Sequence, residues 1–228
     1  MKLRYNTPMI LYHAFWQILT WFREALFVVF RPRYWRLFLA FQFEYFLHSS
    51  YYYVDKNPDE NDVFGYTPFF TAARILKKIE HWQGRSLRGE RMLDLGSGDG
   101  RFLLTGAVGF GLVGLGMELN ERLVAKCQAI THYIKCNAEF FDDDFMKGSW
   151  IGYEVIFVAW TTFTPSRVKA ITDKAVEEMV PGAWLVTLSE PAEHDALTVI
   201  DSFSAWFSWG LSRVYVQRRY CREKQSDI

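Results

Sequence analysis

The segment Arg91–Phe102, RMLDLGSGDGRF, constrains the fold of this chain more than any other. It begins with the short apolar run Met92–Leu95, continues through the glycine-rich stretch Gly96–Gly100, and leads into a helical pattern that starts near Arg101. Glycines let the backbone turn sharply and approach a ligand closely, and free amides at a helix N-terminus attract an anion. The segment therefore predicts a strand, a tight turn and a helix in an open α/β sheet, with a ligand crevice at the carboxyl ends of the strands.

A second acidic residue supports the same prediction. Val113–Leu119 has the apolar character of a second strand, and Glu118 near its end follows Asp94 by 24 residues. A carboxylate at this place can accept hydrogen bonds from both hydroxyls of a ribose. The dinucleotide fingerprint G-x-G-x-x-G is not met, because Arg101 stands where that motif needs a small residue. Asn120 is expected to cap the next helix.

The rest of the chain continues to alternate helices and strands. A helix over 68–79 is expected before the first strand, and another is expected to begin at Thr164 and Pro165 by the capping rules. Further strands are expected at 132–136, 154–160 and 183–189, followed by an antiparallel pair at 203–209 and 214–218. This order predicts a Rossmann-like α/β sheet.

Four short sequences occur together in this chain and resemble one family: DLGSGDGR, GMELN, AEFF and WTTF. The family is the lysine methyltransferases of the telomeric-silencing histone type, with the similar mitochondrial enzymes that methylate a lysine on the ATP synthase c-subunit. The resemblance covers roughly residues 63–190 and is specific at the cofactor site. It implies the seven-stranded class I methyltransferase fold, methyltransferase activity, and S-adenosyl-L-methionine as the cofactor.

The resemblance also implies contacts for individual residues. Asp94–Arg101 are expected to contact the methionine part of the cofactor, and Glu118 is expected to accept hydrogen bonds from the ribose. Glu139 is expected to be the acceptor for the adenine amino group, and Phe140 is expected to cover the adenine ring. A family segment that lies over the cofactor has a glutamate where this chain has Tyr66. The full set of expected cofactor-binding residues is Phe64, Gly65, Thr67, Asp94, Gly96, Ser97, Gly98, Gly100, Arg101, Glu118, Asn120, Glu139 and Phe140. The last two are expected just after the third strand.

Methyl transfer from a sulfonium is a direct displacement that needs alignment, exclusion of water and a neutral nucleophile. A lysine acceptor must lose its proton, and an apolar channel favours that loss because burial destabilises the ammonium. The candidates for this channel, or alternatively for ordinary loop packing, are Trp160, Thr161, Thr162 and Phe163. No metal is required, and Asp142–Asp144 is expected to form a hydrated acidic turn because it lacks the alternate spacing of a calcium loop.

Nucleic acid is not expected as a partner. The chain has a formal net charge of zero and no basic stripe outside its N-terminal part. It also lacks the Asp-Pro-Pro-Tyr type of motif found in enzymes that methylate exocyclic base amines. The resemblance to lysine methyltransferases, with the basic and aromatic N-terminal part of the chain, implies a protein lysine on a membrane-associated substrate as the acceptor. A small-molecule acceptor (lipid or quinone) and a non-catalytic subunit of a larger complex are the alternatives.

Residues 1–54 form a basic, aromatic helical extension. They hold 18 of the 41 Phe, Trp and Tyr residues and a net charge of +4. Two helices separated at Pro32 are expected, and the second, from Tyr34, is apolar nearly all round. Such helices dock on a membrane surface, on a larger membrane complex or on the domain that follows. The acidic segment 55–63 is expected to link them to a methyltransferase domain at 64–228.

The cysteines bear on the compartment. Cys127, Cys136 and Cys221 have neither the spacing of a zinc site nor the even count of a disulfide framework, which favours a reducing compartment. Together with the extension, this predicts a membrane-associated protein at the bacterial cytoplasmic face or the mitochondrial inner membrane.

Overall fold

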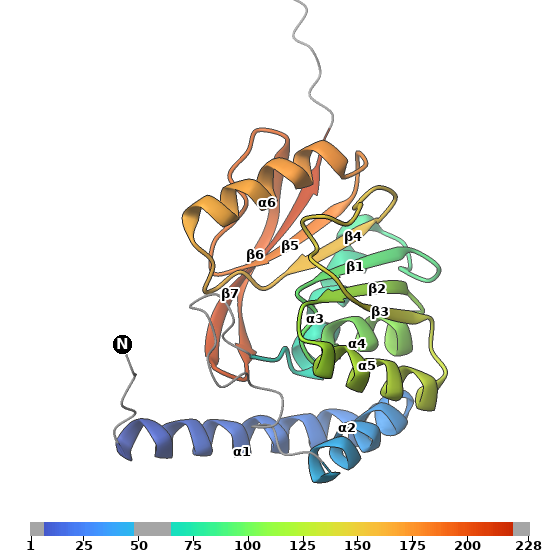
Figure 1. The fold of residues 1–228 in the computed structure, drawn as a ribbon, viewed down its shortest axis with the longest axis vertical. Coiled ribbons are helices and arrows are strands. Elements are labelled where there is room, and N and C mark those ends of the chain that lie inside the picture. Colours follow the sequence, from blue (N-terminus) through green and yellow to red (C-terminus); the bar gives the residue numbers. More distant parts are fainter. Residues whose placement is uncertain (1–6, 48–64, 221–228) are drawn as a thin grey trace, which may run out of the picture.

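The computed structural model describes residues 7–47 and 65–220, and these residues build a seven-stranded sheet (Figure 1). The strands are β1 (Arg91–Leu95), β2 (Val113–Glu118), β3 (Ala138–Asp142), β4 (Val155–Val158), β5 (Trp184–Leu188), β6 (Leu197–Phe207) and β7 (Gly210–Arg219). Their order across the sheet is β3-β2-β1-β4-β5-β7-β6, and β7 runs antiparallel to β5 and β6. The predicted Rossmann-like sheet with an antiparallel closing pair is confirmed.

Helices cover both faces of the sheet. α3 (Phe69–Gln83), α4 (Arg101–Phe110) and α5 (Glu121–Ile134) pack on one face, and α6 (Pro165–Glu178) packs on the other. Successive side chains of a strand point to opposite faces, so Met92 joins the core under α3–α5 while Leu93 joins the core under α6. The central strands are buried on both faces, which explains their continuous apolar sequences.

The third strand lies later in the chain than predicted. Residues 132–134 form the last turn of α5, Lys135 ends that helix with a φ of 55°, and β3 begins only at Ala138. The prediction at 132–136 was wrong because the buried stripe of α5 continues at helical spacing into these strand-forming residues. That stripe consists of Leu123, Val124, Cys127, Ile130 and Ile134.

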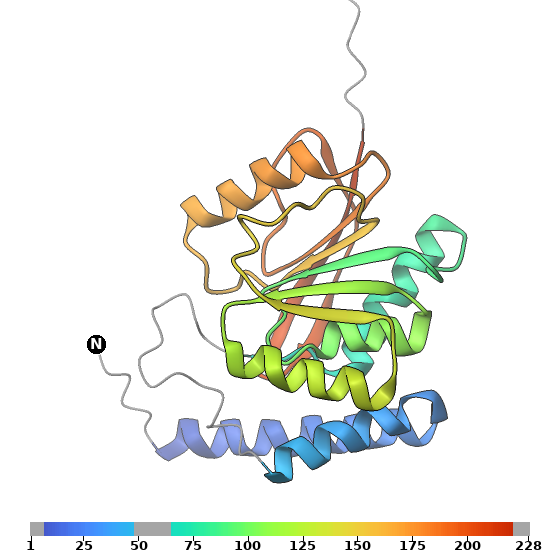
Figure 2. The same cartoon turned by 45° about the vertical axis from the view of Figure 1, so that its right-hand side comes forward.

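The extension forms a second helical layer below α3–α5 (Figure 2). α1 (Thr7–Val29) and α2 (Trp35–Leu47) lie side by side there, joined through the short 3₁₀ turn η1 (Pro32–Tyr34). The predicted break at Pro32 is therefore confirmed. The second helix, with the turn before it, buries Tyr34, Leu37, Phe38 and Phe41.

Within residues 7–47 and 65–220, no helix combines the length and the hydropathy needed to cross a bilayer. The expected linker 55–63 and the candidate Phe64 lie outside the described residues.

α1 also reaches the β6–β7 end of the sheet. The Trp16 indole stacks on Trp206 with 3.6 Å between ring centroids, and its N–H donates to the Phe207 carbonyl at 2.8 Å. The Trp206 indole N–H in turn donates to the Thr20 hydroxyl at 2.7 Å. Because these contacts are specific in geometry, α1 is fixed against the sheet.

Candidate functional site

The glycine-rich segment forms the tight turn expected between β1 and α4. Gly96, Gly98 and Gly100 have φ angles of 70°, 55° and 77°, a left-handed backbone that residues with side chains rarely adopt. Gly100 also has no room for a side chain, since a Cβ there would lie 2.8 Å from Cys127 Sγ and from Phe140 Cζ. The turn is thereby packed tightly at the carboxyl end of β1, where the crevice was predicted.

Glu118 ends β2 and is bonded to this turn. Its Oε2 accepts a hydrogen bond from the Gly98 N–H at 2.9 Å, and its Oε1 accepts one from the Asn120 N–H at 3.0 Å. Asn120 caps α5 as predicted, because its side-chain oxygen accepts from the amides of Arg122 and Leu123. The carboxylate expected to bind a ribose is thus held beside the turn by two backbone amides.

Two buried oxygen atoms at this turn have no hydrogen-bond partner among the described residues. They are Oδ2 of Asp94 and Oγ of Ser97, and the two residues are 1% and 8% exposed. Burial raises the pKa of the Asp94 carboxyl to about 8, and the Leu103 amide only partly opposes this. A buried polar group without a partner costs free energy, so the site is suited to a ligand that brings a hydrogen-bond donor or a cation to Asp94.

Arg101, the first residue of α4, is held by carboxylates from two parts of the chain. Oε2 of Glu24 in α1 lies 2.7 Å from its Nη1, and Oδ2 of Asp99 lies 2.8 Å from its Nε. Burial lowers the pKa of the guanidinium, but the two carboxylates raise it by more, so Arg101 stays charged. The guanidinium also lies over the Tyr66 ring, 3.9 Å from the centroid.

Glu24 was not identified from the sequence. It is 1% exposed, and its second carboxylate oxygen accepts the Phe69 N–H at 2.9 Å, which caps the start of α3. The signal that could have found it is its position as the sole acid in an otherwise apolar helix, because a buried acid needs a partner.

The segment 65–67 lies beside Arg101. A Cβ on Gly65 would lie 2.3 Å from Cε3 of Trp209, so only glycine fits against that ring. The Tyr66 N–H donates to Ser208 Oγ at 2.8 Å, and Thr67 is buried. The segment therefore connects the β6–β7 turn to the start of α4. Where the family has a glutamate, this chain places an aromatic ring on the guanidinium.

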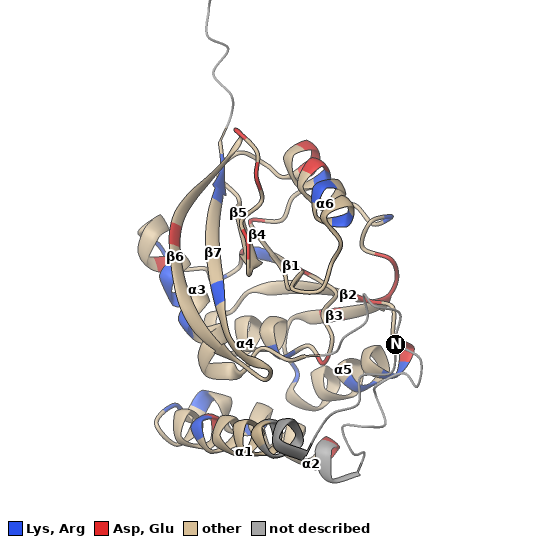
Figure 3. Ribbon diagram, turned by 90° about the vertical axis from the view of Figure 1, so that its left-hand side faces the viewer, with Lys and Arg blue, Asp and Glu red and all other residues tan. Residues whose placement is uncertain are grey.

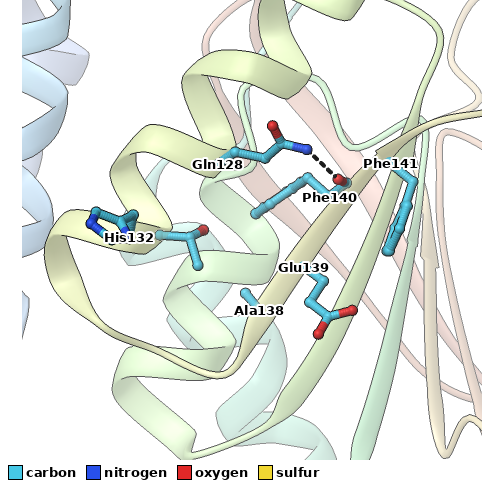
Figure 4. A pocket seen from close by; sticks show the side chains of 7 residues that line it. Gln128, His132, Ala138, Glu139, Phe140 and Phe141 are labelled. Carbon is cyan, nitrogen blue, oxygen red and sulfur yellow. Dashed lines mark hydrogen bonds between the residues drawn. The ribbon is translucent and has the colours of Figure 1, made fainter.

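Glu139 and Phe140 lie inside β3 and not after it. Glu139 pairs with Leu115 of β2, and it lines a shallow pocket at the sheet edge near the last turn of α5 (Figure 4). Phe140 is 2% exposed and packs where Gly100 and Gly116 leave space for its ring. The structure thus puts Phe140 in the core beneath the turn and separates Glu139 from Glu118 by three positions of register.

Asp142 is the residue that ends β3, and it pairs with Glu118 at the end of β2. Asp142 was expected only in the acidic turn, because the third strand was predicted too early in the chain. In that turn the Asp143 side chain accepts the Asp144 N–H, and the Asp144 side chain accepts the Met146 N–H. Across the residues that the structure describes, no group of three His, Cys, Asp or Glu side chains is placed to hold a metal ion.

The four channel candidates follow β4, which lies beside β1 in the sheet. Trp160 is 1% exposed and its indole N–H donates to the Glu190 carbonyl at 3.2 Å, so this side chain belongs to the core under α6. Phe163 is partly buried against the same core. Thr161 and Thr162 are exposed. The loop therefore offers the two threonines, and in part Phe163, to an acceptor.

Known structures share this fold. The RNA methyltransferase from Salinibacter ruber in complex with S-adenosyl-L-homocysteine matches with a TM-score of 0.57 and 22% identity, over 71% of this chain and 97% of that one. TrmN from Thermus thermophilus matches with a TM-score of 0.58 and 14% identity, over 70% of this chain but only 51% of TrmN. A mutant of MtNAS in complex with S-adenosylmethionine matches with a TM-score of 0.52 and 11% identity, over 67% and 63%.

Other comparisons give no match: no protein-family model and no curated protein sequence matches this chain. The structural matches nevertheless agree with the overall fold described above. The chain has the class I methyltransferase fold.

Proposed function

We propose that this chain is an S-adenosylmethionine-dependent methyltransferase. The observation that carries the proposal is a pair of buried oxygen atoms, Asp94 Oδ2 and Ser97 Oγ, at a turn built from left-handed glycines. Neither atom has a hydrogen-bond partner within residues 7–47 and 65–220. The ammonium group of the methionine part is the kind of donor that Asp94 lacks. Glu118 stands beside the turn as the acceptor for the ribose hydroxyls. The fold neighbours that contain S-adenosylhomocysteine and S-adenosylmethionine support the same cofactor.

When bound, the cofactor supplies a methyl group on a sulfonium, which a nucleophile takes by direct displacement. The chain must therefore orient the cofactor and the acceptor and exclude water. The residues of the turn and Glu118 perform the first task. The acceptor approaches along the loop after β4, because that loop and the turn follow two neighbouring parallel strands.

For the acceptor we propose the side chain of a lysine in a membrane-associated protein. Four motifs shared with lysine methyltransferases and the basic, aromatic extension support this choice. The lysine ammonium would first lose a proton to water. The neutral amine would then take the methyl group as the carbon–sulfur bond breaks, which leaves S-adenosylhomocysteine and a methylammonium. The exposed side chains of Thr161 and Thr162 provide hydroxyl groups that can guide the amine, while Phe163 provides an apolar surface beside them.

The cofactor part of the proposal is tested by calorimetry with S-adenosylhomocysteine. We expect the wild type to bind and Glu118→Ala to bind at least tenfold more weakly, because hydrogen bonds to a charged group contribute about 1.5–3 kcal/mol. Glu121→Ala is the matched control, since this exposed acid lies three residues away in the first turn of α5. Wild-type protein that binds no S-adenosylhomocysteine would contradict the proposal.

The acceptor is tested separately with tritiated S-adenosylmethionine. The chain is incubated with membrane and soluble extracts, and protein, lipid and RNA fractions are counted. We expect label in membrane protein, recovered as methyl-lysine after acid hydrolysis and absent with Glu118→Ala. Label only in lipid or quinone extracts would establish the small-molecule alternative, and label only in RNA would contradict the protein acceptor. Cofactor binding without any labelled product would indicate a non-catalytic subunit.

A further inference from the structure

From Tyr12 to Val29, the side of α1 that faces away from the sheet presents mainly apolar side chains. Thr20, Glu24 and Val28, spaced four apart, form the buried side. The opposite side presents large apolar side chains that are between 44% and 77% exposed, up to the residue that follows the helix. They are Tyr12, Phe15, Ile18, Phe22, Leu26, Val29 and Phe30. Trp21 is also exposed, on the side of α1 that faces α2.

α2 continues this surface. Its exposed residues Trp35, Leu39 and Phe43 are spaced four apart and therefore share one side of the helix. The two helices are joined by the Trp21 indole N–H, which donates to Gln42 Oε1 at 2.8 Å. We call the exposed apolar residues of α1 and α2 the outer face. Soluble monomers rarely expose an apolar surface of this extent, so the outer face calls for a partner.

The helical layer 7–47 carries more basic than acidic residues along its ribbon (Figure 3). The exposed basic residues of the layer are Arg23, Arg31, Arg33 and Arg36. Arg33 and Arg36 donate to the carbonyls of Gly109 and Tyr133, and Arg23 lies over the rings of Phe70 and Trp206. These guanidinium groups therefore lie beside the outer face, toward the domain. The acids of the layer's described residues do not balance them, because Glu24 is buried against Arg101 and Glu44 is half-buried.

The positive charge of the layer distinguishes between two possible partners of the outer face, a second copy of the chain and a lipid surface. A second copy seated symmetrically on the same face would bring arginines toward arginines, which disfavours the pairing. Lipid phosphates are anionic and accept hydrogen bonds from guanidinium groups, while the acyl chains next to them take up apolar side chains. The outer face offers both kinds of group side by side.

We propose that the outer face docks on an anionic lipid bilayer, with α1 lying in the plane of the interface. α1 has 23 residues and is thus about 35 Å long at 1.5 Å per residue, which provides a broad contact without any spanning segment. The candidate site lies just above this contact, since Glu24 on the inner side of α1 touches Arg101. An acceptor that reaches the turn would therefore lie close to the lipid headgroups. The inference does not depend on which acceptor is methylated.

The test is co-sedimentation of the full chain with vesicles of phosphatidylcholine alone or with 30% phosphatidylglycerol. We expect binding to the anionic vesicles, weaker binding to the neutral ones, and loss of binding as salt is raised. Ile18→Asp should weaken binding at least tenfold, because it puts a charge in the centre of the outer face. Ile151→Asp is the matched control: Ile151 is 63% exposed against 68% for Ile18, and it precedes β4 on another part of the surface.

Several outcomes would overturn the proposal. One is a wild-type chain that sediments with neither vesicle, and another is equal loss of binding for both variants. A third is a dimer in analytical ultracentrifugation that Ile18→Asp converts to a monomer, because a second copy would then be the occupant. S-adenosylhomocysteine binding by Ile18→Asp shows that the variant is folded. That measurement also separates failure of this proposal from failure of the proposed methyltransferase function.

Discussion

Glu24 in α1 and Arg101 at the start of α4 form a buried ion pair, with 2.7 Å between Oε2 and Nη1 across 77 residues of sequence. Arg101 follows directly after the last glycine of the turn. The helix that carries the outer face is therefore bonded to the turn that carries the candidate site. A displacement of α1 would take Glu24 away from Arg101 and leave Asp99 as the carboxylate against the guanidinium.

Glu24→Ala should lower the free energy of unfolding by about 3–5 kcal/mol, because removing one partner leaves a buried charge uncompensated. Denaturant unfolding monitored by circular dichroism measures the change. Asp173→Ala is the control, since its ion pair with Lys169 is exposed and contributes at most about 0.5 kcal/mol. Equal effects of the two substitutions would show that the buried pair contributes no more than a surface pair.

Asp94 predicts a dependence on pH. Its folded pKa of about 8 lies above the ordinary value of 3.8. Between these values the folded chain holds a proton that the unfolded chain has released, so this contribution to stability is lost as pH rises toward 8. The ionised carboxylate also binds an ammonium better, so affinity for S-adenosylhomocysteine should increase from pH 6.5 to 8. Asp94→Asn should flatten both trends in thermal melting and calorimetry, and an unchanged slope would rule out Asp94 as the titrating group.

Gly100→Ala should disrupt the turn. Its φ of 77° strains any side chain, and the new Cβ would clash with Cys127 and Phe140. We expect a loss of at least about 2 kcal/mol in stability and at least tenfold in affinity for S-adenosylhomocysteine. Gly84→Ala is the matched control, because Gly84 has a φ of 69° but nothing within 4 Å of the added atom. It should cost about 1 kcal/mol of strain and leave binding unchanged.

The register of β3 distinguishes the positions of two acids, Asp142 and Glu139, relative to Glu118, which the sequence alone did not. Asp142→Asn should weaken the binding of S-adenosylhomocysteine, since Asp142 ends β3 next to Glu118. Glu139→Gln should leave it within twofold, because Glu139 lies three positions earlier at the pocket of Figure 4. Isothermal titration of both variants decides. The reverse ranking would restore Glu139 as the adenine acceptor.

The sequence predicted the sheet and the turn because both follow from local rules. The glycines at 96, 98 and 100 and the cap at Asn120 have residue types that their backbone requires. The break at Pro32 and the start of α6 at Pro165 are equally local. Turns, caps and helix starts that depend on neighbouring residues in the sequence were therefore predicted correctly.

What the sequence could not give depends on contacts between distant residues. β3 was misplaced because helical and strand-like patterns overlap near Ile134, and only the pairing with β2 settles where the strand lies. Glu24 and Tyr66 were not linked to Arg101, because nothing in sequence connects positions 24, 66 and 101. Trp160 was a candidate for an acceptor channel or for loop packing, and its burial under α6 is likewise a tertiary outcome.

The stacking of Trp16 on Trp206 has a consequence for how the chain is made. The two rings are 190 positions apart, so α1 leaves the ribosome long before the strand that receives it. Until β6 and β7 are synthesised, the part of α1 around Trp16 lacks the surface on which it packs, and contacts of such large sequence separation form slowly. A nascent chain of this kind is prone to aggregate unless something shields its first helix. A lipid surface near the ribosome, or a chaperone, would therefore shield α1 during synthesis, before the protein can act as an enzyme.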